Sequence, residues 1–360
     1  MKIAFVSAAR SSHTIKWVNA LAGRGHRVTL YSLPDHKAPT NSIDARVSVD
    51  YLPRGGFRGY FNNAGVLRRR IRDFAPDVVN VHYASGYGTL ARLSRVHPIL
   101  LSVWGSDVYD FPLISPLHHH LVGTNIRRAD ALASTSEVMA EQVRRVFGYQ
   151  KEITITPFGV DCSLFSPGGA PHTPFTVGTV KALEEKYGMD YLIRGFHQFR
   201  QSCPDPRAVR LLIYGKGSRK DELQRLIDEL GEQDQISLMG ALPNTQVPEV
   251  IRQMDVFVLP SILDSESFGV SAVEAMACGV PVIASDVDGF RETVANRVTG
   301  VIVPRKDAGA IADALADLAA DAEKRAAYGH AGRERALALY DFEKNVDTME
   351  ALYARLAGIN

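Results

Sequence analysis

The sequence predicts an α/β fold made of two doubly wound parallel sheets. The chain has 360 residues, which is more than one hydrophobic core comfortably serves. Short apolar runs alternate with stretches of helical spacing in both halves, a pattern typical of parallel strands covered by helices. This alternation stops once, at residues 154–174, where proline and glycine accumulate. We therefore expect one Rossmann-like domain at residues 1–165 and a second at residues 166–340.

The first domain opens with a β-α-β unit. Residues 2–7 (KIAFVS) form an apolar run, residues 14–25 have helical spacing and end at a glycine, and residues 26–32 (HRVTLYS) form the next run. Later strands are expected at VVNVHY, ILLSVW and ALAST, and a helix at EVMAEQVRRVFG. Strands that each lead into a helix predict a parallel sheet.

The second domain repeats this pattern after the linker. Strands are expected at FTVGTV, RLLIYG, QISLMG, VFVLPS, PVIAS and GVIV, and helices at MDYLIRGFHQFRQ, KDELQRLIDELG, VPEVIRQM, GVSAVEAMACG and AGAIADALADLAAD. Residues 341–360 are expected to form an amphipathic helix that packs back onto the first domain. Two such domains leave a cleft between the carboxyl ends of their strands, where ligands of these folds bind.

The composition excludes several classes of protein. Apolar residues make up 46% of the chain and charged residues 22%, so a disordered chain is excluded. There is no run of 18 apolar residues, and the N-terminal segment turns polar too soon for a secretion signal. The three cysteines lie far apart and suit free thiols in a reducing compartment. We therefore expect a cytoplasmic protein.

The net charge of +1 hides an asymmetry. Residues 1–160 carry 20 Lys and Arg against 11 Asp and Glu, whereas the remainder carries 21 against 29. Basic residues are densest at residues 54–74, where the arginine cluster from Arg68 to Arg72 is interleaved with aromatic and aliphatic residues. This segment is either a solvated helix with a buried apolar stripe or a surface that contacts an anionic membrane.

Two glutamates, Glu266 and Glu274, flank a Phe-Gly-Val step ahead of an apolar run. If a helix begins near Gly269, its first amides attract an anion such as a phosphate. Over helical geometry the two acids would lie about 12 Å apart. Glu274 could then accept hydrogen bonds from the hydroxyls of a ribose, and Glu266 could accept them from a sugar on the far side of a diphosphate. The alternative is one acid that interacts with the helix dipole and one surface glutamate.

The segment DSESFGVSAVEAMACGVPVIASDVDGFRETV resembles the E-x7-E signature of the retaining GT-B glycosyltransferases of family four. The segments VGTVKALEEKYGMDYLIRGF, LIYGKG and DVFVLPS resemble other parts of that family's second domain. The segment ITPFGVDCSLF resembles its interdomain motif, with Phe158 in place of asparagine. The resemblance covers essentially the whole chain. It implies a GT-B fold and transfer of a hexosyl group, with retention, from a nucleotide-diphosphate sugar to a hydroxyl acceptor.

The resemblance also implies donor-site residues. Lys181 and Lys186 match the family's two cations that stabilise the leaving diphosphate, although lysine lacks the bidentate fork of arginine. Together with Glu266 they are the expected catalytic groups of the second domain. The expected donor-binding residues there are Ser267, Phe268, Gly269, Val270, Glu274, Gly215, Met239 and Gly240. The expected donor is a UDP- or GDP-sugar.

In the first domain the match is weaker. Ser12 and His13 follow the first strand and could present helix amides to the diphosphate, while His13 is either a cap or an acceptor contact. His82 matches a strand-end histidine that is either structural or catalytic. Trp104 stands where the family has a histidine near the transferred sugar. Asp107 could bind an acceptor hydroxyl or cap the following turn.

Two sequences that could suggest a metal are interpreted otherwise. Asp286 to Asp288 read D-V-D but follow the apolar strand after the acid pair, and His118 to His120 are adjacent histidines without a partner at ligand spacing. We therefore expect no metal and no other cofactor, apart from the nucleotide-sugar as co-substrate.

The predicted function is a metal-independent, retaining hexosyltransferase of surface-polysaccharide or glycolipid assembly. The basic first domain favours a lipid-linked or anionic acceptor at the inner face of the membrane, while a small soluble acceptor stays open. No nucleic-acid partner is expected. The alternatives are a nucleotide-sugar 2-epimerase or hydrolase on the same fold, and a catalytically inactive sugar-nucleotide-binding subunit.

Overall fold

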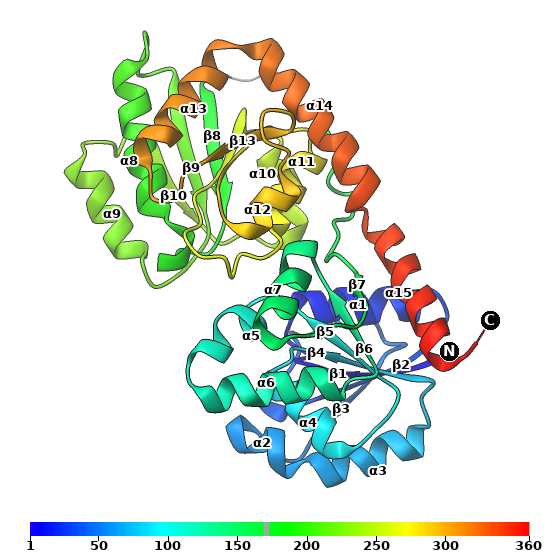
Figure 1. Ribbon diagram of the computed structural model, residues 1–360. Helices are drawn as coiled ribbons and strands as arrows, with labels where there is room; N and C mark the ends of the chain where they lie inside the picture. The colour runs from blue at the N-terminus through cyan, green and yellow to red at the C-terminus, as the bar shows by residue number, and fades with distance from the viewer. Residues whose placement is uncertain (169–172, 360) are drawn as a thin grey trace. The chain divides into compact units, whose positions relative to one another are not determined.

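A computed structural model describes residues 1–168 and 173–359 and divides the chain into two compact units (Figure 1). The N-terminal unit contains Met1–Phe158 and the chain from Glu343 onward, and the C-terminal unit contains Gly159–Phe342. The division falls after Phe158, before the boundary expected at residue 165. Residues 169–172 of the expected linker lie outside the described residues.

The N-terminal unit is built on a sheet of seven parallel strands in the order β3-β2-β1-β4-β5-β6-β7. The strands are β1 (Lys2–Val6), β2 (Arg27–Ser32), β3 (Ser48–Tyr51), β4 (Val78–His82), β5 (Ile99–Val103), β6 (Ala131–Ser134) and β7 (Ile153–Ile155). The helices are α1 (Ser12–Gly23), α2 (Gly56–Asn62), α3 (Ala64–Phe74), α4 (Gly86–Ser94), α5 (Ser106–Tyr109), α6 (Pro116–Arg128), α7 (Glu137–Phe147) and α15 (Phe342–Ala357), with 3-10 turns η1 (Pro34–His36) and η2 (Phe111–Leu113).

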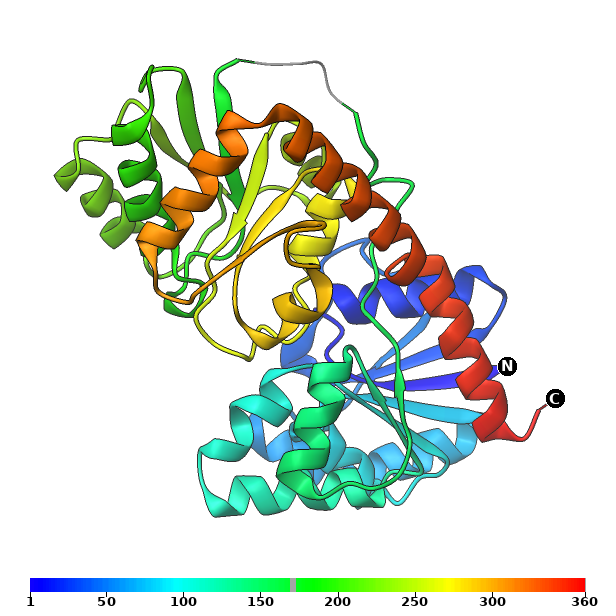
Figure 2. The same cartoon turned by 45° about the horizontal axis from the view of Figure 1, so that its top comes forward.

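Helices cover both faces of this sheet. Apolar side chains of α3, α4, α6 and α7 share one buried cluster with the strands. The last helix, α15, lies beside α1 (Figures 1 and 2). It is held there by Arg24, which pairs with Glu343 at 2.7 Å and Glu350 at 2.5 Å, and by the buried Tyr353 hydroxyl, which lies 2.6 Å from the Asn80 amide. The final helix is therefore part of the N-terminal unit.

The C-terminal unit is built on six parallel strands in the order β10-β9-β8-β11-β12-β13. The strands are β8 (Phe175–Val180), β9 (Val209–Tyr214), β10 (Ile236–Gly240), β11 (Val256–Leu259), β12 (Val282–Ser285) and β13 (Gly300–Val303). The helices are α8 (Met189–Ser202), α9 (Lys220–Glu229), α10 (Val247–Ile251), α11 (Val270–Ala277), α12 (Asp288–Thr293), α13 (Ala308–Ala320) and α14 (Ala322–Leu339), with 3-10 turns η3 (Glu185–Tyr187) and η4 (Asn244–Gln246).

Helix α14 has no counterpart among the predicted elements because its buried face lacks large apolar residues. The face consists of Gly329, Gly332 and Ala336. These small residues let α14 approach α11 closely: a Cβ on Gly329 would lie 2.0 Å from the carbonyl oxygen of Gly279, and one on Gly332 would lie 3.2 Å from the Met276 side chain. Small-residue packing of this kind leaves no hydrophobic periodicity in the sequence.

The predicted α/β class with two parallel sheets is confirmed. The edge strand β3 was missed because only Val49 and Tyr51 of its four residues are apolar and none of the four is fully buried, and β7 was missed because it lies at the start of the expected linker. Among the described residues, no helix is both long and apolar enough to cross a lipid bilayer.

The contact of α14 with α11 gives a first prediction. We expect Gly329→Ala to lower the thermal unfolding midpoint by about 5 °C, because overpacking a tight helix contact costs about 1–3 kcal/mol. The matched control is Gly65→Ala in α3, where a Cβ would meet open space. Scanning calorimetry checks both, and equal midpoints for the two variants would contradict the close approach.

Candidate functional site

An ion pair between Lys181 and Glu266 lies at the carboxyl end of the C-terminal sheet. Lys181 directly follows β8, and its Nζ lies 2.6 Å from Oε2 of Glu266. Both side chains are largely covered, with exposed fractions of 13% and 12%. Burial lowers the pKa of Lys181, but Glu266, Tyr187 and Glu274 more than offset this and leave it above its ordinary value. Lys181 is therefore a charged ammonium at neutral pH.

The second predicted cation, Lys186, shares an aromatic neighbour with Lys181. Lys186 Nζ lies 5.0 Å from the centroid of the Tyr187 ring, and Lys181 Nζ lies 4.6 Å from it. Cation–π contacts of this kind restrict both ammonium groups. The backbone fixes Lys186 as well, because its carbonyl accepts a hydrogen bond from Ile262 N at 2.9 Å. The structure thus gathers Lys181 and Lys186 around one tyrosine, and Glu266 pairs with Lys181.

Gly215 permits this arrangement by letting two strand ends approach closely. Its φ is +152°, and a Cβ there would lie 1.8 Å from the carbonyl oxygen of Lys181. The nitrogen of Gly215 donates to the carbonyl of Gly240, which ends β10 with a φ of +79°. Met239, the preceding residue, is 48% exposed. Gly215, Met239 and Gly240 therefore lie along the ends of adjacent strands, next to Lys181.

Helix α11 begins where the sequence predicts, with Gly269 as its N-terminal cap residue and Val270 as its first residue. Gly269 has a φ of +83°, and a Cβ there would lie 2.6 Å from the Phe290 ring. Ser267 and Phe268 are buried, and the Phe268 ring packs edge-on against Tyr340 at 5.5 Å. Packing of Phe268 and Gly269 consequently fixes the backbone from which α11 begins.

The expected separation of Glu266 and Glu274 assumed a helical rise over the whole interval. The helix begins only at Val270, so the interval from Glu266 to Glu274 is helical over its last part alone. Glu266 pairs directly with Lys181, and Glu274, on α11, also contributes to raising the pKa of that lysine. The two carboxylates act on the same ammonium group.

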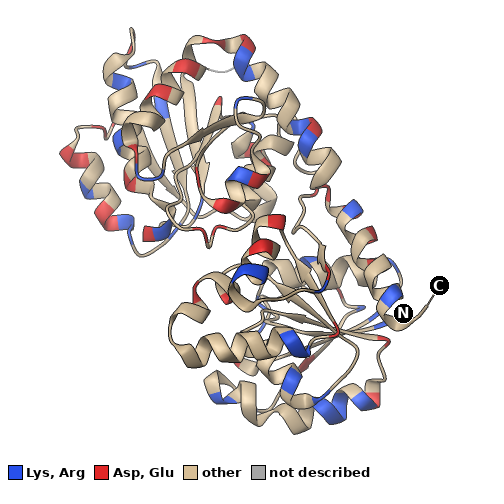
Figure 3. Cartoon of the chain, viewed as in Figure 1, with Lys and Arg blue, Asp and Glu red and all other residues tan. Residues whose placement is uncertain are grey.

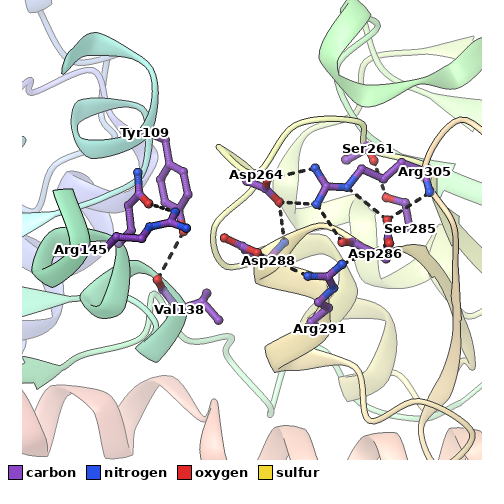
Figure 4. A network of polar contacts seen from close by, with 11 residues as sticks. Tyr109, Val138, Arg145, Ser261, Asp264, Ser285, Asp286, Asp288, Arg291 and Arg305 are labelled. Carbon is purple, nitrogen blue, oxygen red and sulfur yellow. Dashed lines mark hydrogen bonds and ion pairs between the residues drawn. The ribbon is translucent and has the colours of Figure 1, made fainter. Parts of the chain in front are cut away.

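The loop that carries Glu266 is anchored by the network of polar contacts in Figure 4. Arg305 donates to Asp264 at 2.7 Å and to Asp286 at 3.1 Å, which joins the loop before α11 to the loop after β12 (Figure 4). Gly289 N donates to the carbonyl of Glu266, and a Cβ on Gly289 would lie 2.3 Å from that oxygen. This network fixes the backbone of Glu266.

The same network explains the D-V-D sequence. Asp286 pairs with Arg305 and with Arg291, and Asp288 lies 3.9 Å from Arg291. The three adjacent histidines lie on α6, where His118 bonds to the Ser115 hydroxyl at 2.7 Å. In the part of the chain that the structure describes, no group of three or more His, Cys, Asp or Glu side chains could hold a metal ion. Metal independence stays a prediction.

In the N-terminal unit, His82 ends β4 and is 1% exposed. Its Nδ1 lies 3.1 Å from the Ser7 hydroxyl and 3.3 Å from the Thr14 hydroxyl. Burial, together with the nearby His13, holds the pKa of His82 well below its ordinary value, so the ring is neutral. These contacts support the structural interpretation of His82 over the catalytic one.

Asp107 is also buried, and both of its carboxylate oxygens accept backbone hydrogen bonds. Oδ1 accepts from Trp104 N at 3.1 Å and Gly105 N at 2.9 Å, and Oδ2 accepts from Ala84 N at 2.7 Å. Burial raises the pKa of Asp107, although these N–H groups act in the opposite direction. The carboxylate therefore joins the loops after β4 and β5. It does not cap the following turn, because the N-terminal cap residue of α5 is Gly105 and, among the described residues, no side chain caps that helix.

Ser12 and His13 begin α1, with Ser11 as its N-terminal cap. The His13 ring stacks on Phe158 with centroids 3.8 Å apart and lies edge-on to Trp104 at 5.8 Å. Trp104 and Phe158 also contact each other, at 5.3 Å. The two positions that depart from the family pattern thus form one aromatic cluster with His13.

Three residues that position the site were missed by the sequence reasoning. Tyr187, Gly289 and Arg305 each contact or fix a predicted residue, as described above. Tyr187 directly follows Lys186, so its place could have been inferred from the cation next to it. Arg305 and Gly289 carry no comparable signal, because their partners lie far away in the sequence.

The all-parallel, doubly wound units define the class of protein. The chain superposes on the sucrose-phosphate synthase of Thermosynechococcus elongatus with a TM-score of 0.87, over 99% of both chains at 22% identity. It superposes on a protein of Anabaena solved in complex with UDP-glucose with a TM-score of 0.78, over 98% of this chain and 100% of that chain at 18% identity. The fold is the GT-B glycosyltransferase fold, as predicted.

The family follows from the sequence comparisons. Residues 2–136 match the model described as glycosyl transferase 4-like, and residues 163–335 match that of glycosyl transferases group 1. A GDP-mannose-dependent α-(1-6)-phosphatidylinositol monomannoside mannosyltransferase of Mycolicibacterium smegmatis is 32% identical over 267 residues, covering 69% of this chain and 68% of that protein. The chain therefore belongs to the group 1, family-four glycosyltransferases.

The buried neutral His82 gives a second prediction. Below about pH 6.5 the unfolded chain binds a proton at this ring that the folded chain does not, so His82 makes stability fall by up to about 1.4 kcal/mol per pH unit. We expect His82→Gln to reduce the drop in unfolding midpoint between pH 7 and pH 5.

The control for this prediction is His330→Gln, whose side chain is 76% exposed. It should show the same pH dependence as the unaltered chain in thermal unfolding followed by circular dichroism. An unchanged pH dependence in the His82 variant would contradict a neutral, buried ring.

Proposed function

We propose that the chain is a retaining hexosyltransferase that uses a nucleotide-diphosphate sugar and needs no metal. The observation that carries this proposal is the covered Lys181–Glu266 pair, with Lys186 on the same tyrosine. Two ammonium groups beside a helix N-terminus suit the charge that grows on a leaving diphosphate. Family membership supports the class of reaction.

In the proposed reaction, the bond between the anomeric carbon and the leaving phosphate oxygen breaks through an oxocarbenium-like state. The acceptor oxygen bonds to the same face of the sugar, and its proton passes to the departing phosphate oxygen. Lys181 and Lys186 stabilise the diphosphate, and no protein nucleophile takes part. Glu266 exchanges its bond to Lys181 for hydroxyls of the transferred sugar, and Glu274 binds the ribose.

For the donor we propose a UDP- or GDP-sugar. The Anabaena structure contains UDP-glucose, and the Mycolicibacterium relative is named for GDP-mannose. The ends of β9 and β10 at Gly215, Met239 and Gly240 present mainly backbone atoms, because two of these three residues are glycines. We propose that the nucleotide lies along them, with the amides of Ser267 to Val270 at the diphosphate.

For the acceptor we propose a lipid-linked or anionic hydroxyl compound, used at the cytoplasmic face of a membrane in surface-polysaccharide or glycolipid assembly. Helix α3, which carries basic segments in Figure 3, exposes Arg68, Arg69 and Arg72 and buries Leu67 and Ile71. Phe57 and Phe61 on the preceding α2 are 70% and 38% exposed. Exposed aromatic side chains next to arginines suit an anionic bilayer surface.

One experiment separates this proposal from its alternatives. A thermal-shift screen of UDP-, GDP-, TDP- and ADP-sugars should raise the melting temperature with one donor. That donor is then incubated with and without a panel of lipid-linked and soluble acceptors, in the presence of a chelator. Transfer with a retained anomeric configuration supports the proposal, while isomerised or free sugar without acceptor supports the epimerase or hydrolase. Binding without any turnover would support the inactive subunit.

The third prediction concerns Glu274. We expect Glu274→Ala to raise the donor KM at least about tenfold, because a lost hydrogen bond from ribose hydroxyls to a carboxylate costs about 1.5–3 kcal/mol. The control is Glu249→Ala on the neighbouring α10, where the glutamate is exposed. Steady-state kinetics with unchanged donor KM in the Glu274 variant would remove this residue from the donor site.

The fourth prediction concerns Lys186. We expect Lys186→Ala to lower kcat at least about tenfold through the loss of leaving-group stabilisation. Lys220→Ala, an exposed lysine at the start of α9, serves as the control and should keep its turnover. Equal kcat values for both variants would assign Lys186 to the surface rather than to the reaction.

A further inference from the structure

A basic cavity lies in the N-terminal unit at the edge of the sheet opposite to His82 and Asp107. Its volume is about 780 Å³, within the range of small-molecule sites. It is formed where α4 and α6 end and where β5, β6 and β7 begin. The charged residues that line it are Arg92, Arg95, Arg127, Arg128, Lys151 and Asp130.

The cavity carries a large excess of positive charge. Five cations face one carboxylate. That carboxylate, Asp130, is already engaged, because it accepts from Ile99 N and bonds to the His97 ring, both at 2.7 Å. The ends of two helices contribute roughly half a negative charge each. About three positive charges therefore remain without a counter-charge.

Contacts within the protein do not neutralise the positive charges of these five side chains. Arg92 donates to the Asn125 side chain at 2.7 Å, and Arg127 lies over Gly123. Within residues 1–168 and 173–359, the side chains of Arg95, Arg128 and Lys151 make neither a hydrogen bond nor an ion pair. The helix dipoles account for the arginines at the ends of α4 and α6, including Arg95, which is the C-terminal cap residue of α4, but Lys151 lies in the loop before β7.

A second cavity in the C-terminal unit shows what a balanced arrangement looks like. It measures about 420 Å³ and is lined by three arginines and three carboxylates. There Arg219 pairs with Glu222 and lies 3.9 Å from Asp190. In the basic cavity the like charges instead lie close enough to affect each other: burial and the charge of Arg128 lower the pKa of Arg92.

We infer that the basic cavity binds a ligand with two or more phosphate groups. Guanidinium groups bind phosphate oxygens through paired, charge-assisted hydrogen bonds. A phosphate group carries about 1.5 to 2 negative charges near neutral pH, so two of them match the uncompensated charge. Carboxylates, with one charge each, would need about three groups in the same space. The cavity lies at the amino ends of the strands of the N-terminal unit, whereas the proposed donor-site residues follow the carboxyl ends of strands.

The experiment uses full-length chains that carry Lys181→Met and Lys186→Met, so that the donor site cannot bind the probe. Inorganic tripolyphosphate is titrated by calorimetry, and phosphatidylcholine vesicles with and without cardiolipin are tested by co-sedimentation. The test variant adds Arg95→Gln and Arg128→Gln. The control adds Arg194→Gln and Arg225→Gln in the balanced cavity, which removes the same charge.

We expect the test variant to lose at least about tenfold in affinity for one of the probes, while the control stays within about twofold of the parent. If the test variant loses affinity for tripolyphosphate alone, the cavity binds a soluble ligand. If it loses affinity for cardiolipin vesicles alone, the cavity binds a lipid headgroup. A further chain with Arg68→Gln and Arg69→Gln should bind tripolyphosphate like the parent.

The inference is overturned if the parent binds neither probe, or if the test variant binds both as the control does. It is also overturned if Arg68→Gln and Arg69→Gln weaken tripolyphosphate binding as much as the cavity substitutions, because the binding would then reflect general basicity. Equal unfolding midpoints for all chains show that each variant is folded.

Discussion

The proposed chemistry depends on one constraint: a lysine ammonium is kept charged and in place inside a largely covered site. Water is scarce around Lys181, so its charge is costly unless carboxylates lie beside it. Glu266 supplies the direct partner and Glu274 a second negative charge. Gly215 and Gly289 allow the backbone to bring these groups together, because any larger residue would collide with a carbonyl oxygen. Contacts within the C-terminal unit therefore hold the lysine and the two glutamates in place.

Much of this arrangement could be predicted from the sequence. Apolar runs and helical spacing are local, so they located nearly all strands and the start of α11 directly after Gly269. Helix α14 escaped because a helix that buries glycine and alanine has no apolar stripe. The separation of Glu266 and Glu274 could not be derived from the sequence for a different reason. The residues from Glu266 to Gly269 are not helical, so the distance that they span cannot be obtained by counting residues.

Contacts between distant residues explain what sequence reasoning could not find. Arg305 fixes Asp264 and Asp286, and no spacing rule connects these positions. Trp104 and Phe158 each look like an isolated departure from the family pattern, but their rings touch and His13 packs on both. Four titratable residues of the predicted site are largely buried, but they differ in their hydrogen-bond partners. His82 bonds to two hydroxyl groups and Asp107 to three backbone N–H groups, whereas Lys181 and Glu266 pair with each other.

The most direct test of the central claim is a calorimetric titration of UDP and of GDP into Glu266→Gln and Lys181→Met. If Glu266 holds the ammonium only until a diphosphate replaces it, Glu266→Gln should bind the preferred nucleoside diphosphate at least as tightly as the unaltered chain, and Lys181→Met should bind it at least about tenfold more weakly. Equal losses of affinity in both variants, or no loss in either, would contradict this account.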